Sequence, residues 1–237
     1  MRLLPVAILA GGLASRLHPL TASVPKSLLE IAGRPFILHQ LELLRSQGID
    51  RVVLCVGHLG EQIQRLVGDG RELGLKVDYS FDGNPLRGTG GALKHALALL
   101  GNSFLVLNGD SYLPCALADI QAAYHAAGRL ALMAVVRNDN RWDRSNVLLS
   151  DGELIEYNKR SQRSGMAHID FGVSVFSSRV FAGYGTTRVI DLADICHDLC
   201  VAGQLAAFEV NGRFYEIGSL QGIAATEDFL RRRAQIA

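Results

Sequence analysis

The chain has 237 residues, 49% of them hydrophobic, and its 24 Lys and Arg side chains nearly balance its 23 Asp and Glu side chains. This length can bury a full core as one large domain or two small ones. The net charge of +1 argues against a nucleic-acid partner, which usually requires a strongly basic face. Charge, glycine or proline interrupts the apolar runs every few residues, so we expect no membrane span.

The N-terminal residues and the cysteines favour a cytoplasmic protein. Met1–Pro5 leads directly into an apolar run and leaves no room for a signal peptide. The cysteines lie far apart or at helical i, i+4 spacing, and they form neither a zinc knuckle nor a CxxC pair. We therefore expect reduced thiols at Cys55, Cys115, Cys196 and Cys200.

The first half of the chain alternates apolar runs with helical patterns. The predicted strands are Pro5–Ala10, Arg51–Gly57, Leu75–Phe81 and Ser103–Asn108. The predicted helices are Pro35–Gln47, Leu59–Val67, Thr89–Leu100 and Ala116–Ala127. This alternation is typical of an α/β fold with a mainly parallel sheet covered by helices on both faces. Ligands bind beyond the carboxyl ends of such strands, so the turns after Ala10 and Asn108 should share one cleft.

The second half of the chain changes character. The predicted strands are Leu130–Arg137, Val147–Leu149, Glu153–Tyr157 and Phe171–Phe176, with a hairpin signal at Ser150-Asp151-Gly152. After them we expect a helix near Asp191–Val201, strands at Leu205–Val210 and Arg213–Ile217, and a closing helix from Ser219. No linker or repeat divides the sequence. We therefore predict one domain over residues 1–237, divided into 1–128, a β-rich lobe over 129–218 and a closing helix over 219–237.

The segment after the first strand predicts a polyphosphate site. Gly11 and Gly12 follow the apolar run, and Arg16 and Lys26 come next with no acidic residue among them. Backbone N–H groups freed by the glycines can approach an anion, and the two cations can neutralise it. About half of the glycine turns that follow a first strand have only a structural role. Both the GxGxxG and the GxxxxGK[ST] fingerprints are absent.

The same segment carries a family resemblance. Leu-Ala-Gly-Gly-x-x-x-Arg-Leu at 9–17, with Pro25-Lys26 beyond it, resembles the signature of sugar-phosphate nucleotidyltransferases, Gly-Gly-x-Gly-Thr-Arg-Leu followed by Pro-Lys. Ala14 and Ser15 stand at the Gly and Thr positions. Ser15 keeps a hydroxyl, and Ala14 can still offer its N–H if the turn requires no positive φ there. The resemblance covers nearly the whole chain.

The resemblance implies a Rossmann-like, GT-A-like nucleotidyltransferase fold. Residues 1–128 would form the nucleotide-binding half, and 129–218 would hold the sugar phosphate and a second metal ligand. The backbone of the first loop would surround the nucleotide, with contacts from Leu9, Ala10, Gly11 and Gly12.

A second glycine loop resembles the part of the family that packs on the nucleotide base. Pro85–Ala92 is similar to Pro-Leu-Gly-Thr-Gly-Gly-Ala with Arg87 as an extra residue, which implies contacts from Gly88 and Thr89. By itself the segment is a helix start that Thr89 can cap. Asp82 stands where the family often has a base-reading side chain. A carboxylate can accept from guanine N1–H and N2–H2, which uracil and thymine cannot match, so Asp82 points to GTP.

Two acidic residues resemble the metal ligands of the family. Asn108-Gly109-Asp110 matches its Asn-Gly-Asp motif, although a lone Asp at a strand end is more often a turn former. Phe214–Ser219 occupies the place of Asp-x-Gly-Thr, with Glu216 as the acid. The resemblance implies Mg2+ at Asp110 and Glu216, and a nucleotide contact at Asn108. Two carboxylates suffice because Mg2+ keeps several waters and phosphate oxygens.

The β-rich lobe resembles a sugar-phosphate site. Lys159 resembles the lysine of the Glu-Lys-Pro element, which would pair with the acceptor phosphate, although it could be a surface lysine. Ile169–Val173 is similar to the family's Asn-Ala-Gly strand, which implies that Asp170 and Gly172 contact sugar hydroxyls. Asn146 sits where a backbone glycine contact is usual.

The implied reaction joins a sugar 1-phosphate to a nucleoside triphosphate and releases pyrophosphate. Arg16 would hold the departing phosphates, and Lys26 would bridge the α-phosphate and the incoming phosphate. Asp110 completes the catalytic set. Motifs around residues 110–112, 145–147 and 157–159 look most like bacterial enzymes that activate heptose or mannose 1-phosphate with GTP for surface polysaccharides. Whether the protein is a homo-oligomer stays open.

Three alternatives compete with this hypothesis. Within the class, the protein could be a uridylyltransferase acting on an amino-sugar 1-phosphate of cell-wall recycling. A GT-A glycosyltransferase normally carries Asp-x-Asp, but Tyr112 stands at the second position here. A non-catalytic sugar-nucleotide sensor could lose Lys26, Asp110 or Glu216, all of which are present.

Two further groups of residues carry weaker signals. Trp142 belongs to a solvated loop or to a specificity lid. We expect Arg231–Arg233 on the solvated face of the last helix.

Overall fold

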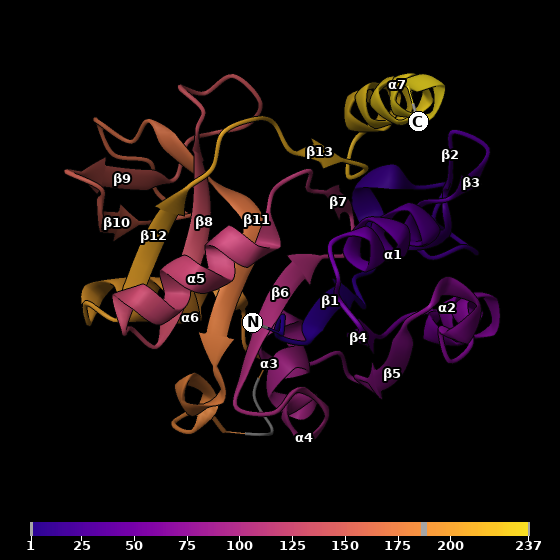
Figure 1. Cartoon of the computed structure of the whole chain (residues 1–237), viewed down its shortest axis with the longest axis horizontal. Coiled ribbons are helices and arrows are strands. Elements are labelled where there is room, and N and C mark those ends of the chain that lie inside the picture. Colours follow the sequence, from indigo (N-terminus) through magenta and orange to yellow (C-terminus); the bar gives the residue numbers. More distant parts are fainter. Residues whose placement is uncertain (1, 186–188, 237) are drawn as a thin grey trace.

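A nine-stranded mixed sheet forms the centre of the molecule (Figure 1). The computed structural model describes residues 2–185 and 189–236, so Met1 and Ala237, the first and last residues of the predicted domain, lie outside the described residues. The main path through the sheet is β10 (Glu153–Tyr157), β9 (Val147–Ser150), β11 (His168–Ser177), β6 (Ser103–Asn108), β1 (Val6–Ala10), β4 (Arg51–Val56) and β5 (Lys76–Phe81). Off this path, β8 (Ala131–Arg137) pairs with β11, and β12 (Leu205–Glu209) pairs with β8.

The two halves of the sheet differ in strand direction. Strands β6, β1, β4 and β5 are parallel, as the sequence predicts. Strand β11 runs antiparallel to both β6 and β8, so the β-rich lobe continues the same sheet. Figure 1 shows the lobe strands on one side of β6 and the other parallel strands on the opposite side. Asp151 and Gly152 both have positive φ, 51° and 80°, and close the predicted hairpin between β9 and β10.

Seven helices are described in the structure, with four short 3-10 turns. The helices are α1 (Phe36–Ser46), α2 (Gly60–Val67), α3 (Gly88–His95), α4 (Leu97–Leu100), α5 (Leu117–Ala127), α6 (Leu192–Val201) and α7 (Leu220–Ile236). The 3-10 turns are η1 (Ser15–Leu17), η2 (Lys26–Leu28), η3 (Arg71–Leu73) and η4 (Ser178–Phe181). The single helix predicted over 89–100 is wrong, because Ala96, at φ −82° and ψ −3°, separates α3 from α4.

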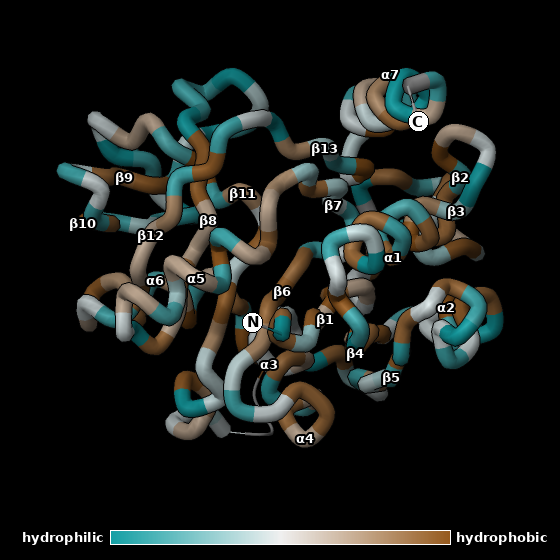
Figure 2. Tube along the Cα trace, in the orientation of Figure 1, coloured by the Kyte–Doolittle hydropathy of each residue, from teal (hydrophilic) through white to brown (hydrophobic). Residues whose placement is uncertain are grey.

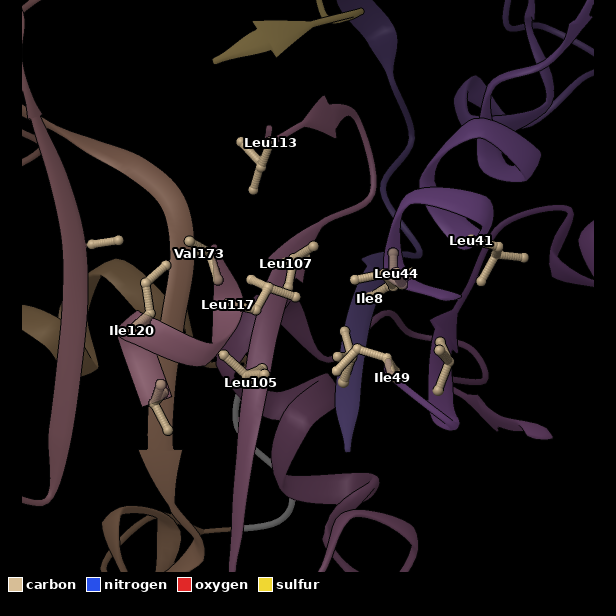
Figure 3. Packing of buried hydrophobic residues seen from close by; sticks show 14 of the residues in the cluster. Ile8, Leu41, Leu44, Ile49, Leu105, Leu107, Leu113, Leu117, Ile120 and Val173 are labelled. Carbon is tan, nitrogen blue, oxygen red and sulfur yellow. The ribbon is translucent and has the colours of Figure 1, made fainter. Parts of the chain in front are cut away.

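Helices cover both faces of the sheet because successive strand residues point to opposite sides. On one face, Ile8 packs with the apolar stripe of α1, and Figure 3 shows Leu41 and Leu44 of that stripe with Leu105 and Leu107 of β6. On the other face, the buried residues of β1, β4 and β6 pack with α3 and α6. Figure 2 shows the hydrophobic stretch of β6 at the centre of the molecule. This arrangement confirms the predicted fold class.

A short antiparallel ladder returns the end of the chain to the parallel half. β7 (Ser111–Tyr112) pairs with β13 (Tyr215–Glu216), so Glu216 lies opposite Ser111. The Ile217 N–H also donates to the Asp110 carbonyl oxygen at 2.9 Å. The strand predicted at 213–217 is therefore real but reduced to two residues, whereas β11 is longer than predicted. A second small ladder joins β2 (Glu30–Ile31) to β3 (Arg34–Pro35).

Helix α7 packs beside this ladder. Phe229 stacks on Tyr215 with ring centroids 4.0 Å apart, in a cluster that includes Tyr112. Arg231–Arg233 are exposed on α7, as predicted, and Arg233 in addition donates from its Nη1 to the Tyr112 hydroxyl at 2.7 Å. Trp142 lies in a loop whose residues Arg141, Asp143 and Arg144 are exposed, while its own half-buried ring meets the edge of Phe214 with ring centroids 5.6 Å apart.

Two sequence-based expectations concern the whole chain. Within the described residues, no helix has the length and apolar character needed to cross a bilayer. The cysteines are free thiols, as predicted, at Cys55, Cys115, Cys196 and Cys200.

Candidate functional site

A cavity of about 310 Å3 lies at the carboxyl ends of β1 and β6. Eleven of the predicted site residues line it: Leu9, Ala10, Gly11, Gly12, Lys26, Asp82, Gly88, Thr89, Asn108, Asp110 and Lys159. The other lining residues are Ala14, Ser27, Cys55, Leu86, Ala92 and Gly109. The turns after β1 and β6 thus share one cleft, as parallel strands require.

The two glycines of the first loop differ in whether the packing of the chain requires a glycine. A Cβ on Gly11 would lie 3.0 Å from the Gly57 backbone N, so the close approach of two strand ends requires glycine there. A Cβ on Gly12 would meet no described atom within 4 Å. The chain's own packing therefore does not require Gly12, whose backbone lines the open cavity.

Ala14 adopts the conformation that would suit a glycine. Its φ is +50°, in the left-handed region. The turn therefore does require a positive φ at this position, which strains an alanine. An L-residue costs about 1–2 kcal/mol in this region. The Ala14 carbonyl oxygen accepts from Leu17 N and from the Thr21 hydroxyl, both at 3.0 Å, and these bonds hold the turn. The side chain of Ser15 lies outside what the structure describes.

Four charged side chains meet where the first loop approaches β7 and β13. Lys26 Nζ lies 2.6 Å from Asp110 Oδ2, and the two side chains are 21% and 27% exposed. A Cβ added to Gly218 would lie 3.5 Å from Asp110 Oδ2, 3.7 Å from Arg16 Nη2 and 2.7 Å from Glu216 Oε2. Arg16 and Lys26 also line an adjoining cavity of about 180 Å3. The predicted catalytic and metal residues thus surround one point.

The start of α7 holds the Glu216 carboxylate. Glu216 accepts from the Gly218 N–H, and its Oε1 accepts from the Ser219 hydroxyl at 2.7 Å. A Cβ on Gly222 would collide with Oε1. Thr226 is fully buried, with its hydroxyl 2.9 Å from the Glu216 carbonyl oxygen. The orientation of Glu216 is therefore set by residues that follow it in the chain.

The two carboxylates fit a magnesium ion better than a metal that needs many protein ligands. Within the described residues, no three His, Cys, Asp or Glu side chains gather as a metal site. Asp110 and Glu216 approach one point, and both retain access to solvent. Mg2+ is commonly held by one or two carboxylates, with water and phosphate oxygens completing its shell.

The other end of the cavity presents a buried carboxylate. Asp82 is 5% exposed, and its Oδ1 has no hydrogen-bond partner among the described residues. Burial raises the pKa of Asp82, while the backbone N–H and positive charge of Arg87 partly oppose the shift. Cys55 lines the same region, and burial raises its thiol pKa to about 12, so it is not a nucleophile near neutral pH. Asp82 therefore offers the cavity an unused acceptor.

The second glycine loop, which the sequence predicts to contact the nucleotide base, also packs against residues 190–192 at the start of α6. Thr89 does not cap α3; its hydroxyl accepts from Leu192 N at 2.8 Å and lies 3.0 Å from Asp191 Oδ1. A Cβ on Gly88 would lie 2.6 Å from the Ile190 carbonyl oxygen. Gly90 N donates to that same oxygen. The loop is thereby fastened to the start of α6, because its glycines allow backbone to approach backbone.

The predicted sugar-lobe residues form a connected group. Asp170 Oδ1 accepts from Gly172 N at 2.8 Å, and Asp170 N donates to Asn146 Oδ1 at 3.1 Å. Burial raises the pKa of Asp170, with Lys159 partly opposing the shift. Gly172 has φ +96°, and a Cβ on it would lie 3.4 Å from Asn108 Nδ2. Lys159 lines the cavity, whereas Asn146, Asp170 and Gly172 are not among its lining residues, so the structure does not bring these three predicted site residues to the cavity wall.

Comparison with known proteins decides the family. A family model described as nucleotidyl transferase matches residues 6–143. The chain belongs to this family.

Relatives within the family differ in their nucleotide. The chain is 29% identical over 218 residues to the catalytic subunit beta of mannose-1-phosphate guanylyltransferase of Danio rerio, covering 89% of this chain and 60% of that one. It is 30% identical over 221 residues to N-acetylmuramate alpha-1-phosphate uridylyltransferase of Neisseria meningitidis serogroup B, covering 90% and 92%. The chain thus spans about 60% of the length of the guanylyltransferase relatives.

The fold is shared with solved structures. HddC from Yersinia pseudotuberculosis, complexed with GMP-PN, superposes with a TM-score of 0.78 at 24% identity, covering 96% of this chain and 100% of that one. Together with the mixed central sheet, this likeness supports the GT-A-like nucleotidyltransferase architecture.

Sequence reasoning missed some lining residues. Gly109 was visible only as part of a motif, yet a Cβ there would lie 2.5 Å from the Leu9 carbonyl oxygen. Ser27 is buried, and its hydroxyl has no partner among the described residues. A serine after a lysine carries no sequence signal that could have identified it.

Proposed function

We propose that the protein transfers a nucleotidyl group from a nucleoside triphosphate to a sugar 1-phosphate and releases pyrophosphate. The observation that carries this proposal is the convergence of Arg16, Lys26, Asp110 and Glu216 around Gly218. These charges lie at one end of a cavity whose other end offers the buried acceptor of Asp82.

The chemistry requires positioning and charge neutralisation more than proton transfer. The attacking phosphate oxygen is already an anion near neutral pH, so no general base is needed. It displaces pyrophosphate in line at the α-phosphorus, and Arg16 would hold the departing phosphates. Lys26 would bridge the α-phosphate and the incoming phosphate, which requires it to exchange its contact with Asp110 for phosphate oxygens.

Asp110 and Glu216 would hold Mg2+ in this reaction. The bound ion supplies charge neutralisation and orientation of the phosphate oxygens. The carboxylates also keep Lys26 and Arg16 oriented by their negative charge. Phosphate oxygens and the cation would replace the present Lys26–Asp110 contact, so neither charge would be left unpaired.

We infer that GTP is the nucleotide. An ionised Asp82 can accept two hydrogen bonds from guanine N1–H and N2–H2, while uracil offers a single N–H. The guanylyltransferase relatives and the GMP-PN complex of HddC support this assignment. We assign a heptose or mannose 1-phosphate as the acceptor, in cytoplasmic synthesis of activated sugars for surface polysaccharide.

The β-rich lobe would bind the acceptor. Lys159 lines the cavity and would pair with the sugar phosphate. Asp170 and the Gly172 backbone would meet sugar hydroxyls, with Asn146 orienting Asp170 through its hydrogen bond. Residues 1–128 and 129–218 would thus divide nucleotide from sugar within one domain.

A uridylyltransferase acting on an amino-sugar 1-phosphate is the second candidate. It is favoured by the Neisseria relative, of which the chain covers 92%. In that case the Asp82 carboxylate would accept the N3–H of uracil alone.

The test is a pyrophosphate-release assay with Mg2+. GTP, UTP, CTP and dTTP are each combined with mannose, heptose, glucose and N-acetylmuramate 1-phosphates. We expect the highest kcat/KM for GTP with a mannose-type acceptor. Turnover of UTP with N-acetylmuramate 1-phosphate alone would establish the second candidate, and no turnover with any pair would contradict the proposal.

A further inference from the structure

A buried glutamine spans the turn that carries Asp110. Gln40 lies in α1 and is 2% exposed. Its Nε2 donates to the Ser111 carbonyl oxygen at 2.7 Å and to the Asn108 carbonyl oxygen at 3.0 Å. These two carbonyls flank Gly109 and Asp110. One side-chain amide thus joins both ends of the turn from outside the sheet.

Two other elements hold the same turn by its backbone. Gly109 N donates to the Leu9 carbonyl oxygen at 3.0 Å, at the end of β1. Ile217 N donates to the Asp110 carbonyl oxygen at 2.9 Å, next to β13. These bonds fasten the middle of the turn, whereas Gln40 fastens its two ends. Together these bonds restrain the backbone on both sides of Asp110.

Gln40 is a costly side chain for stability alone. Both of its amide hydrogens are used, but its Oε1 is buried and has no hydrogen-bond partner among the described residues. A buried acceptor without a partner destabilises the folded state. An apolar side chain of similar length would avoid that cost at the loss of the two donor bonds. That loss would leave the Asn108 and Ser111 carbonyl oxygens without this donor, so the amide is matched to the turn that carries Asp110.

We propose that Gln40 is a positioning residue for Asp110. By holding the two ends of the turn, Gln40 places the Asp110 carboxylate in contact with Lys26 and on the side of Gly218 where Glu216 also lies. Loss of the amide would let the turn relax. The affinity of the Asp110 and Glu216 carboxylates for a divalent cation would then fall. This inference rests on the proposed function, because it assumes that Asp110 binds the cation of the reaction.

The chain contains a matched control in Gln121. It is 1% exposed, its Nε2 donates to the Arg2 carbonyl oxygen at 3.1 Å, and its Oε1 accepts from Leu4 N at 2.7 Å. These bonds lie at the entry to β1, opposite the end that carries the cavity. Gln121→Met removes a buried amide of the same kind without touching the Asp110 turn.

The experiment compares Gln40→Met with Gln121→Met in the full chain. Mn2+ binding in the presence of GTP is measured by electron paramagnetic resonance, with Mg2+-dependent pyrophosphate release and melting temperature measured beside it. We expect Gln40→Met to weaken Mn2+ binding about tenfold and to lower kcat about 10- to 100-fold. The KM for GTP at saturating Mg2+ should change less than threefold. Gln121→Met should change the melting temperature alone.

Each outcome separates the inference from the proposed function. Equal Mn2+ binding by wild type and Gln40→Met would overturn the positioning role, as would matching losses in both variants. If Gln40→Met fails to fold, Gln40→Asn keeps the amide hydrogens on a shorter stem and should show a smaller loss in the same direction. A wild-type protein that releases no pyrophosphate with any pair contradicts the proposed function, while its Mn2+ affinity still tests Gln40.

Discussion

The two halves of the site differ in how their polar groups are used. In the half that we propose binds the nucleotide, called here the nucleotide half, Asp82 and Ser27 face the cavity with atoms that have no described partner. In the β-rich lobe, Asp170, Gly172 and Asn146 are bonded to one another, and Lys159 is the lobe residue of the predicted set that lines the cavity. The nucleotide half therefore offers polar atoms that are free to bind a ligand. In the lobe, the polar side chains are already held in place by hydrogen bonds to one another.

The difference follows from the strands that carry these residues. Parallel strands end at one edge, and their turns point outward into a shared cleft. The long antiparallel strand β11 instead runs past the cleft, and its pairing with β8 is interrupted between Asp170 and Ser174. That interruption includes Gly172 at φ +96°, and a Cβ on Gly172 would lie 3.4 Å from Asn108 Nδ2.

The largest expected effect comes from the charged end of the nucleotide half. Asp110→Asn keeps the size of the side chain but removes the charge that meets Lys26. We expect kcat for pyrophosphate release to fall roughly 10²- to 10³-fold, the scale of one electrostatic contact to the transition state. Asp50→Asn, which removes an exposed partner of Arg2, is the control and should leave kcat unchanged. A near-normal kcat for Asp110→Asn would break the proposed mechanism.

Asp82→Asn tests the other end of the cavity. Loss of two hydrogen bonds to a charged acceptor should lower kcat/KM for GTP about 10- to 100-fold, with a smaller change for UTP. Asp78→Asn, on the same strand but paired with Arg51, is the matched control. If GTP and UTP lose activity equally, Asp82 does not read the base.

The same carboxylate gives a pH dependence of stability. Burial raises the pKa of Asp82 above its unfolded value, so its contribution to stability is full below about pH 4 and falls as pH rises through the folded pKa. Asp82→Asn removes this titration. The melting temperature of the variant relative to wild type should therefore increase between pH 4 and pH 7. A constant difference across that range would show that Asp82 does not titrate as its burial requires.

The lobe should respond differently to a similar change. Asp170→Asn should raise the KM for the sugar 1-phosphate about tenfold and leave the KM for the nucleotide within twofold, the scale of one hydrogen bond to a charged group. Initial rates with each substrate varied in turn measure both constants. If the variant changes only the melting temperature, the hydrogen bonds of Asp170 stabilise the fold and do not bind the sugar phosphate.

The smallest expected effect concerns the strain in the first loop. Ala14→Gly removes a left-handed alanine worth about 1–2 kcal/mol, offset by about 0.4–1 kcal/mol for the greater freedom of glycine in the unfolded chain. The melting temperature should rise by about 1–3 °C. Ala116→Gly, at φ −81°, is the control and should lower it. A fall for both variants would mean that the turn is not strained.

Much of the fold could be predicted because its signals are local. Most predicted strand and helix bounds lie within one residue of the observed ones, as for α1 and β6. Asp151-Gly152 formed the predicted hairpin because both residues tolerate positive φ. The residues that line the cavity from the turns after β1 and β6 were predictable for the same reason, since parallel strands place their ends together.

The sequence by itself thus determined the alternation of strands and helices, the glycine turn and the identity of the charged residues. Only the tertiary structure decided that a two-residue ladder brings Glu216 beside Asp110, that Thr89 fastens α6, and that Gln40 spans the Asp110 turn. These contacts join residues distant in the chain, and two paired residues or one buried amide leave no periodic pattern. Their partners are chosen by packing of the whole molecule, which no local window of the sequence contains.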